Sequence, residues 1–242
     1  MTRTHSIIIR FLIIPTILVS SLFSQSEQDL SLTKKNEQKL IYGKIISSVE
    51  QLPDSKTHKC QTMGIVYYPI EKIWEALGEY NHYNDFMPRT TVAFLINPDA
   101  ISKFENLEIT DWEQFEKDIE NYKIDHFGTN PFYFYKRLNI PWPYKDRHYI
   151  LKMERNDKEY FSHWIEIIGN SKENRGSWKL VPFKGNNRKT LAIYTLFIDP
   201  GIRISSKISK LGTKIALPGT IKALRKHLLK EFLKEKRKKK KS

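Results

Sequence analysis

Hydrophobic and polar residues alternate after Pro143 in a way that predicts a β-strand with one buried face. That face carries four consecutive alternate residues, Arg147, Tyr149, Leu151 and Met153. The opposite face carries Lys152 and therefore reads as the solvated one. An arginine that projects inward with apolar side chains needs a buried partner or a ligand. Arg147 is thus the first candidate functional residue.

The same alternation, with turn residues between the segments, predicts further strands at hairpin-like intervals. Alternation directs His163, Ile165, Trp178 and Leu180 toward the interior that Arg147 faces. Short helices are predicted after Pro69 and over 83–87. The predicted strands span 40–49, 60–67, 90–96, 131–138, 147–154, 161–168, 177–182 and 190–199.

A helical apolar stripe follows the last strand and predicts a long C-terminal helix that closes the interior. The stripe is interrupted at Pro218-Gly219, where we expect a kink or break. Ile208 and Leu211 are its candidate ligand contacts. The stripe consists of Ile204, Ile208, Leu211, Ile215, Ile221, Leu224, Leu228 and Phe232.

The segment 97–126 interrupts the strand pattern and is treated as an insertion. Asp111 is placed to cap a helix in which Trp112, Phe115 and Ile119 follow helical spacing. This helix either packs on the domain or forms a lid over a ligand entrance, and the sequence leaves both open.

Five passages, in this order along the chain, resemble motifs of the bacterial START-like lipid-transfer superfamily, near its polyketide-cyclase and coenzyme Q-binding groups. The likeness runs from Leu40 to Leu229. His148 departs from it, since an acid is usual there, and Ile202 replaces a frequent second glycine. The passages are WEALGEYNHYNDFMPRT, IPWPYKDRHYIL, GSWKLVPF, IDPG and LPGTIKALRKHL.

The resemblance implies an α+β helix-grip fold, in which a curved antiparallel sheet wraps a long C-terminal helix around a cavity. We therefore expect one START-like domain over 39–233 that binds a lipid or other hydrophobic ligand without transforming it. The alternative is a cyclase- or aromatase-like enzyme that uses the same cavity. Expected ligand contacts are Arg147, Tyr149, Leu151, Met153, His163, Trp178, Leu180, Ile208 and Leu211.

The residues that bear on catalysis argue for binding. His163 has the chemistry to move protons, but no carboxylate or nucleophile stands at a recognisable spacing from it. Arg147 alternatively pairs with Asp146, Asp199 or Glu166 and only holds the sheet together. No nucleotide, metal or cofactor motif is present, so no cofactor is expected.

Two further residues are expected to be structural. Cys60 is the only cysteine, which excludes an internal disulfide, and it reads as a plain buried thiol. Trp142 stands between two prolines and is expected to pack as a plug more than to serve as a binding platform.

Charge is concentrated at the C-terminus. The 242 residues carry a net charge of +14, and the segment from Pro200 holds 15 basic and 2 acidic residues. The basic tail, 234–242, is either solvated charge or a contact for anionic membrane. Nucleic acid is not an expected partner, because no aromatic residue is interleaved in the last basic run.

The N-terminus has the pattern of a secretory signal. Basic residues precede the apolar run Phe11–Phe23, and small residues suited to cleavage follow it. We expect residues 1–26 to be a signal peptide, 27–38 a polar linker, and the mature protein to be exported to the periplasm, the envelope or the exterior.

Overall fold

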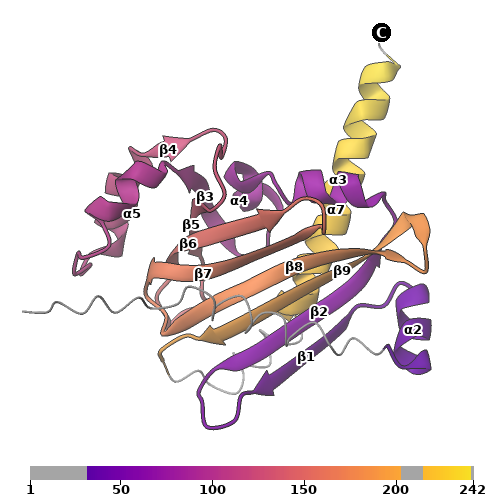
Figure 1. Cartoon of the computed structure of the whole chain (residues 1–242), viewed down its shortest axis with the longest axis horizontal. Coiled ribbons are helices and arrows are strands. Elements are labelled where there is room, and N and C mark those ends of the chain that lie inside the picture. Colours follow the sequence, from indigo (N-terminus) through magenta and orange to yellow (C-terminus); the bar gives the residue numbers. More distant parts are fainter. Residues whose placement is uncertain (1–31, 203–214, 241–242) are drawn as a thin grey trace, which may run out of the picture. The chain divides into compact units, whose positions relative to one another are not determined.

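The computed structural model describes residues 32–202 and 215–240, which build one nine-stranded antiparallel sheet (Figure 1). The strands are arranged in the order β1-β2-β9-β8-β7-β6-β5-β3-β4. Their bounds are β1 Ile46–Gln51, β2 His58–Val66, β3 Thr90–Ile96, β4 Lys123–Ile124, β5 Phe132–Leu138, β6 Arg147–Asn156, β7 Phe161–Gly169, β8 Glu173–Phe183 and β9 Asn186–Asp199.

The helices are short except for the last one, α7. Most predicted strands lie within a few residues of their expected bounds, and β3 matches its prediction. The helices are α2 Lys34–Ile41, α3 Ile70–Ala76, α4 Tyr83–Phe86, α5 Trp112–Glu120 and α7 Leu217–Lys239, with 3-10 helices at Tyr80–His82 and Pro98–Lys103.

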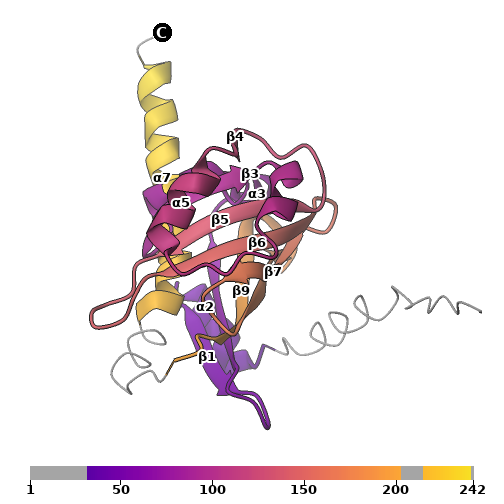
Figure 2. The same cartoon turned by 90° about the vertical axis from the view of Figure 1, so that its left-hand side faces the viewer.

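Helix α7 packs on one face of the sheet, which we call the inner face (Figure 2). Ile221, Leu224 and Leu228 are buried in the main core, as the apolar stripe predicts. Gly64 on β2 permits the close approach, because a Cβ there would lie 2.9 Å from Ile221 Cγ2. Arg225 fixes the crossing, since its Nε and Nη2 donate to the Ile65 carbonyl at 2.9 and 2.6 Å.

Helix α7 begins at Leu217, with Pro218 in its first turn. Proline is tolerated there because the first turn of a helix needs no backbone N–H donor. The helix continues to Lys239, so most of the basic tail is helical and not frayed. Phe232, expected in the buried stripe, is 41% exposed. The expected signal peptide and stripe positions 204–211 lie outside the described residues.

The predicted strand at 40–49 is wrong in its first half, and the last residues of the segment expected to be a polar linker are helical. Helix α2 occupies this region and ends in a Schellman motif at Gly43. The Gly43 N–H donates to the Leu40 carbonyl at 2.9 Å, and the Lys44 N–H to the Lys39 carbonyl at 3.0 Å. Gly43 adopts φ +75°, which favours glycine, so the strand begins only at Ile46.

The inserted segment 97–126 packs on the outer face of the sheet, so the structure favours packing over a lid. Asp111 caps α5, accepting from the Glu113 and Gln114 N–H groups at 3.0 Å each. The second apolar cluster joins Phe115 and Ile119 of α5 to Tyr135 and Ile150 of the sheet. The outer face of β6 is therefore dry at His148 and Ile150, and our prediction of a solvated face is wrong there.

Candidate functional site

A cavity of about 830 Å³ lies at the inner face. Strands β5, β6, β8 and β9 contribute much of its wall, and the start of α7 contributes Leu217. Its volume and largely apolar lining are typical of small-molecule sites that hold hydrophobic ligands. The aromatic side chains in the lining are Tyr83, Phe134, Tyr144, Tyr149, Trp164, Trp178 and Tyr194.

The structure brings five of the nine expected ligand contacts to this cavity. They share one surface because β6 pairs with β5 and β7 on its two sides, so that alternate side chains of β6 project the same way. The five are Arg147, Tyr149, Leu151, Met153 and Trp178.

The other four expected contacts are not among the described lining residues. Leu180 points inward but packs in the main core, where it is 1% exposed. Ile208 and Leu211 lie outside the described residues. His163 belongs to the outer face and is treated separately below.

The inward orientation predicted for His163 is wrong. Trp164 lines the cavity, so its neighbour His163 projects from the opposite face of β7. There His163 Nε2 lies 3.4 Å from Glu154 Oε2 on the paired strand. Ile165 projects outward with it and is 50% exposed. The error arose because both faces of this strand carry large apolar residues, which makes the alternation ambiguous.

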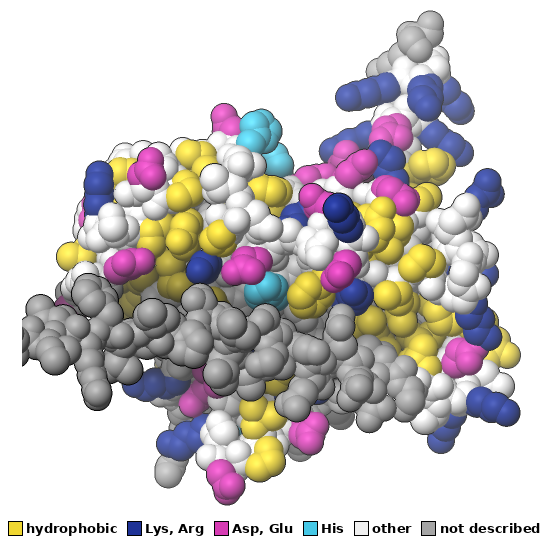
Figure 3. All heavy atoms as spheres, in the orientation of Figure 1, with side chains coloured by type: hydrophobic (Ala, Val, Ile, Leu, Met, Phe, Trp, Pro, Cys, Tyr) yellow, Lys and Arg dark blue, Asp and Glu magenta, His cyan; other side chains and the backbone are white. Residues whose placement is uncertain are grey.

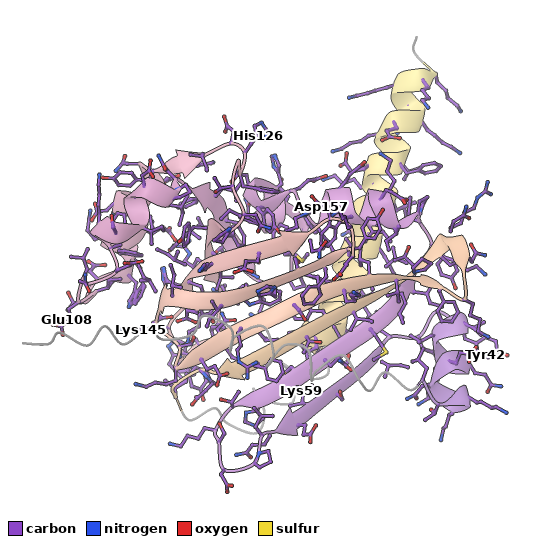
Figure 4. The ribbon with its side chains drawn as sticks, in the orientation of Figure 1. Tyr42, Lys59, Glu108, His126, Lys145 and Asp157 are labelled. Atoms are coloured by element: carbon purple, nitrogen blue, oxygen red, sulfur yellow. The ribbon has the colours of Figure 1, made fainter. Side chains whose placement is uncertain are left out.

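Trp142 also differs from expectation. Its side chain is 90% exposed and plugs nothing among the described residues. The loop that carries it nevertheless reaches the cavity through Ile140, Pro141 and Tyr144. Figure 4 labels Lys145 in this loop, at the opposite end of β6 from Asp157.

Lys136 is a polar lining residue that our sequence analysis missed. It lies on β5 directly opposite Tyr149. The loss of hydration on burial lowers the pKa of Lys136 to about 8. The sequence could have indicated it, because Lys136 shares a strand face with Phe132 and Phe134 and a charged residue is unusual on such an apolar face.

Arg147 is 7% exposed and lines the cavity beside Lys136. Its Nη1 donates to the Lys145 carbonyl at 3.4 Å. Among the described residues no carboxylate lies within 4.0 Å of its guanidinium nitrogens, so the expected alternative of an ion pair with Asp146, Asp199 or Glu166 is not observed there.

The charge of Arg147 influences the carboxylate of Glu166, but that carboxylate is hydrogen-bonded to a different residue. Ser171 donates to Glu166 through both its hydroxyl and its backbone N–H. Burial raises the pKa of Glu166, while hydrogen bonds from Ser171 and Asn174 and the positive charge of Arg147 oppose that rise. Arg147 therefore retains hydrogen-bonding capacity toward the cavity.

Two further polar lining groups, the Tyr149 hydroxyl and the Cys60 thiol, stay protonated and neutral. Burial raises the pKa of Tyr149 well above its usual range, so its hydroxyl remains a protonated donor. Burial also raises the pKa of Cys60 to about 11, which keeps the thiol protonated and unreactive. The lining thus combines apolar walls, neutral donors and several basic side chains, among them Lys136 and Arg147.

Within the described ranges, 32–202 and 215–240, no three His, Cys, Asp or Glu side chains gather as a metal site would require. None of the helices described there has the length and apolar character needed to span a membrane.

His148 lies beneath α5, on the face of β6 opposite the cavity. Its Nδ1 lies 2.7 Å from the Tyr135 hydroxyl, which donates to Glu116 at 2.8 Å. Glu116 is already paired with Arg137 at 2.9 Å. Burial lowers the pKa of His148 to about 4, and the positive charge of Arg137 acts in the same direction.

We expect this histidine to make the domain sensitive to acid. The unfolded chain takes up a proton at His148 near its ordinary pKa of 6.5, whereas the folded domain does so only near 4. His148 therefore does not reduce the free energy of unfolding above about pH 6.5. As the pH drops from there toward 4, it reduces that free energy by up to about 3 kcal/mol. Urea unfolding at a series of pH values measures this loss.

The matched variant is His148→Asn, which places a polar amide near Tyr135 in place of the imidazole and does not titrate. Its free energy of unfolding should fall less steeply between pH 6.5 and 4 than that of the natural chain. Identical slopes for the two proteins would show that His148 is not the source of the pH dependence.

The comparisons with known proteins agree on the fold. No family model matches the chain, and no curated protein matches it significantly. Human STARD10 matches with a TM-score of 0.52 at 15% identity, over 79% of this chain and 72% of that one. TTHA0849 from Thermus thermophilus matches with a TM-score of 0.51 at 10% identity, over 72% of this chain and 98% of that one.

A STAR-related lipid transfer protein from Xanthomonas axonopodis matches with a TM-score of 0.49 at 18% identity, covering 76% of this chain and 93% of that one. Together with the antiparallel sheet and the long last helix, the matches to STARD10 and TTHA0849 confirm the predicted fold class. The chain has the α+β helix-grip fold.

Proposed function

We propose that this protein binds a lipid or another hydrophobic molecule in the cavity at the inner face and carries it without transforming it. The observation that supports the proposal most directly is the cavity itself. Its volume of about 830 Å³ is within the range of small-molecule sites, and aromatic and aliphatic side chains form most of its wall.

The cyclase- or aromatase-like alternative has less support. Of the three polar residues expected to serve it, Arg147 and Tyr149 line the cavity but His163 lies on the other face of the sheet. The described lining offers hydrogen-bond donors and cations, among them Lys136, that suit recognition of a polar head group.

Mass spectrometry of the intact chain, purified without detergent, tests the binding proposal. We expect a fraction of the protein to carry a hydrophobic molecule of defined mass that is released on denaturation. Delipidated protein should take up such a molecule again with a stoichiometry of one. A chain that neither retains nor takes up any hydrophobic molecule would contradict the proposal.

Export and contact with anionic membrane remain predictions. The membrane contact is supported by the last turns of α7, where Lys and Arg side chains gather (Figure 3). Each basic residue close to an anionic surface contributes about 1 kcal/mol.

A further inference from the structure

The charged side chains of the cavity lining are unequally divided in sign. Among the described lining residues five are basic and one is acidic: Lys56, Arg89, Lys136, Arg147, Lys172 and Asp199. The carboxylate of Asp199 is already used in the turn after β9, where its Oδ1 accepts from the Gly201 N–H at 2.9 Å. The cavity therefore carries positive charge that its own residues do not neutralise.

Among the basic lining residues, Lys136 is the one that an anionic ligand would stabilise most. It forms no hydrogen bond or ion pair with any residue in the described ranges, and it projects from a strand face that also carries Phe134 and Leu138. Lys136 is half-buried, and the loss of hydration disfavours its charged form, which is why burial lowers its pKa. An anion beside it would recover the lost interaction.

Arg147 is positioned to contact the same anion. The register of β5 and β6 pairs Lys136 with Tyr149 and Leu138 with Arg147. Lys136 and Arg147 are thus diagonal neighbours on one face, with backbones about 7 to 8 Å apart. Two long side chains at that spacing can converge on a single carboxylate or phosphate, with the Tyr149 hydroxyl as a third donor.

We infer that the cavity takes an amphiphile with one anionic head group, a carboxylate or a phosphate, which Lys136 and Arg147 hold while the apolar tail lies against the aromatic wall. This inference rests on the proposed function and specifies its ligand class. The wall that receives the tail includes Leu151, Trp164, Trp178 and Tyr194.

The test compares ligands that share a tail and differ in head group. Palmitate and hexadecyl phosphate carry the two candidate anions, and hexadecanol is the neutral control. Isothermal titration of the purified, delipidated full chain should show both anions, or one of them, binding at least tenfold more tightly than hexadecanol. The tighter of the two anions identifies the head group as carboxylate or phosphate.

The variants are Lys136→Met and Arg147→Met, which keep the apolar stems and remove the charges. Each should weaken binding of the preferred anion at least tenfold, or about 1.4 kcal/mol, and leave hexadecanol binding unchanged. The control is Lys152→Met, on the outer face of β6, which should bind all three ligands as the natural chain does.

A stability measurement separates recognition from a structural role. Because Lys136 has no partner in the described part of the chain, Lys136→Met should unfold at the same temperature as the natural chain or a higher one. A lower melting temperature, with anion affinity per folded molecule unchanged, would assign Lys136 a structural role and overturn the inference.

The outcomes distinguish the inference from the function it rests on. Equal binding of palmitate, hexadecyl phosphate and hexadecanol, unaffected by either variant, would overturn the anionic head group and leave hydrophobic binding standing. Failure of all three to bind, in a chain that also retains no co-purifying molecule, would overturn both.

Discussion

Replacing Gly176 by valine should prevent the domain from folding. Gly176 lies in β8, opposite Leu196 on β9 and Trp164 on β7. A Cβ at this position would overlap both the carbonyl oxygen of Thr195 and the indole ring of Trp164. Neither can move away, because the first belongs to the sheet backbone and the second is buried, with its Nε1 donating to Asn174 at 3.2 Å.

The expected loss exceeds about 4 kcal/mol, which is most of the stability of a typical domain. Soluble yield and urea unfolding measure it. The matched control is Gly128→Val, because a Cβ at Gly128 meets nothing within 4 Å and its φ lies outside the left-handed region. A Gly176→Val protein as stable as this control would refute the proposed steric conflict.

Gly176 also shows why the fold was predictable from the sequence. It is the first residue of the passage GSWKLVPF. Only glycine fits at this position, because the two neighbouring strands leave no room for a Cβ. Trp178, two residues later, faces the cavity as predicted. Alternation of period two carries the same information along β6, because residues 149–153 have a paired strand on both sides.

Prediction failed where the burial of a residue depends on a segment that is distant from it in the sequence. His148 and Ile150 were expected to face solvent because Lys152 follows them, but α5 covers them and buries both. Trp142 was expected to pack, yet nothing described covers it. Neither outcome is encoded in the local pattern, since each depends on where a different part of the chain lies.

Only part of the candidate site was predicted, because one of its two basic residues was recognised and the other was not. Arg147 was found because an arginine interrupts an otherwise apolar strand face, and Lys136 interrupts its own face in the same way. Lys136 was overlooked because the aromatic residues of Phe132–Leu138 were read only as strand-forming. The sequence signal was present, but its meaning depends on the pairing of β5 with β6, which places the two cations at diagonal positions on one face of the sheet.

Filling the cavity should abolish ligand binding while the domain remains folded. The change is Leu151→Trp combined with Leu196→Trp, which adds two indole rings from β6 and β9 to the space. Because the added atoms enter a hollow, the cost should stay below the 1 to 3 kcal/mol that is typical of overpacking a dense core. Thermal unfolding checks that the variant is folded.

The effect on affinity should be large because the tail of the ligand loses its place. If the indoles exclude only four methylene groups, at about 0.8 kcal/mol each, binding weakens more than a hundredfold. Titration with palmitate or hexadecanol, whichever the natural chain binds more tightly, measures the change. The matched control carries tryptophan at Ile165 and Ile167, which are exposed on the outer face of β7, and should bind normally. A folded cavity variant with the affinity of this control would place the ligand somewhere other than the cavity.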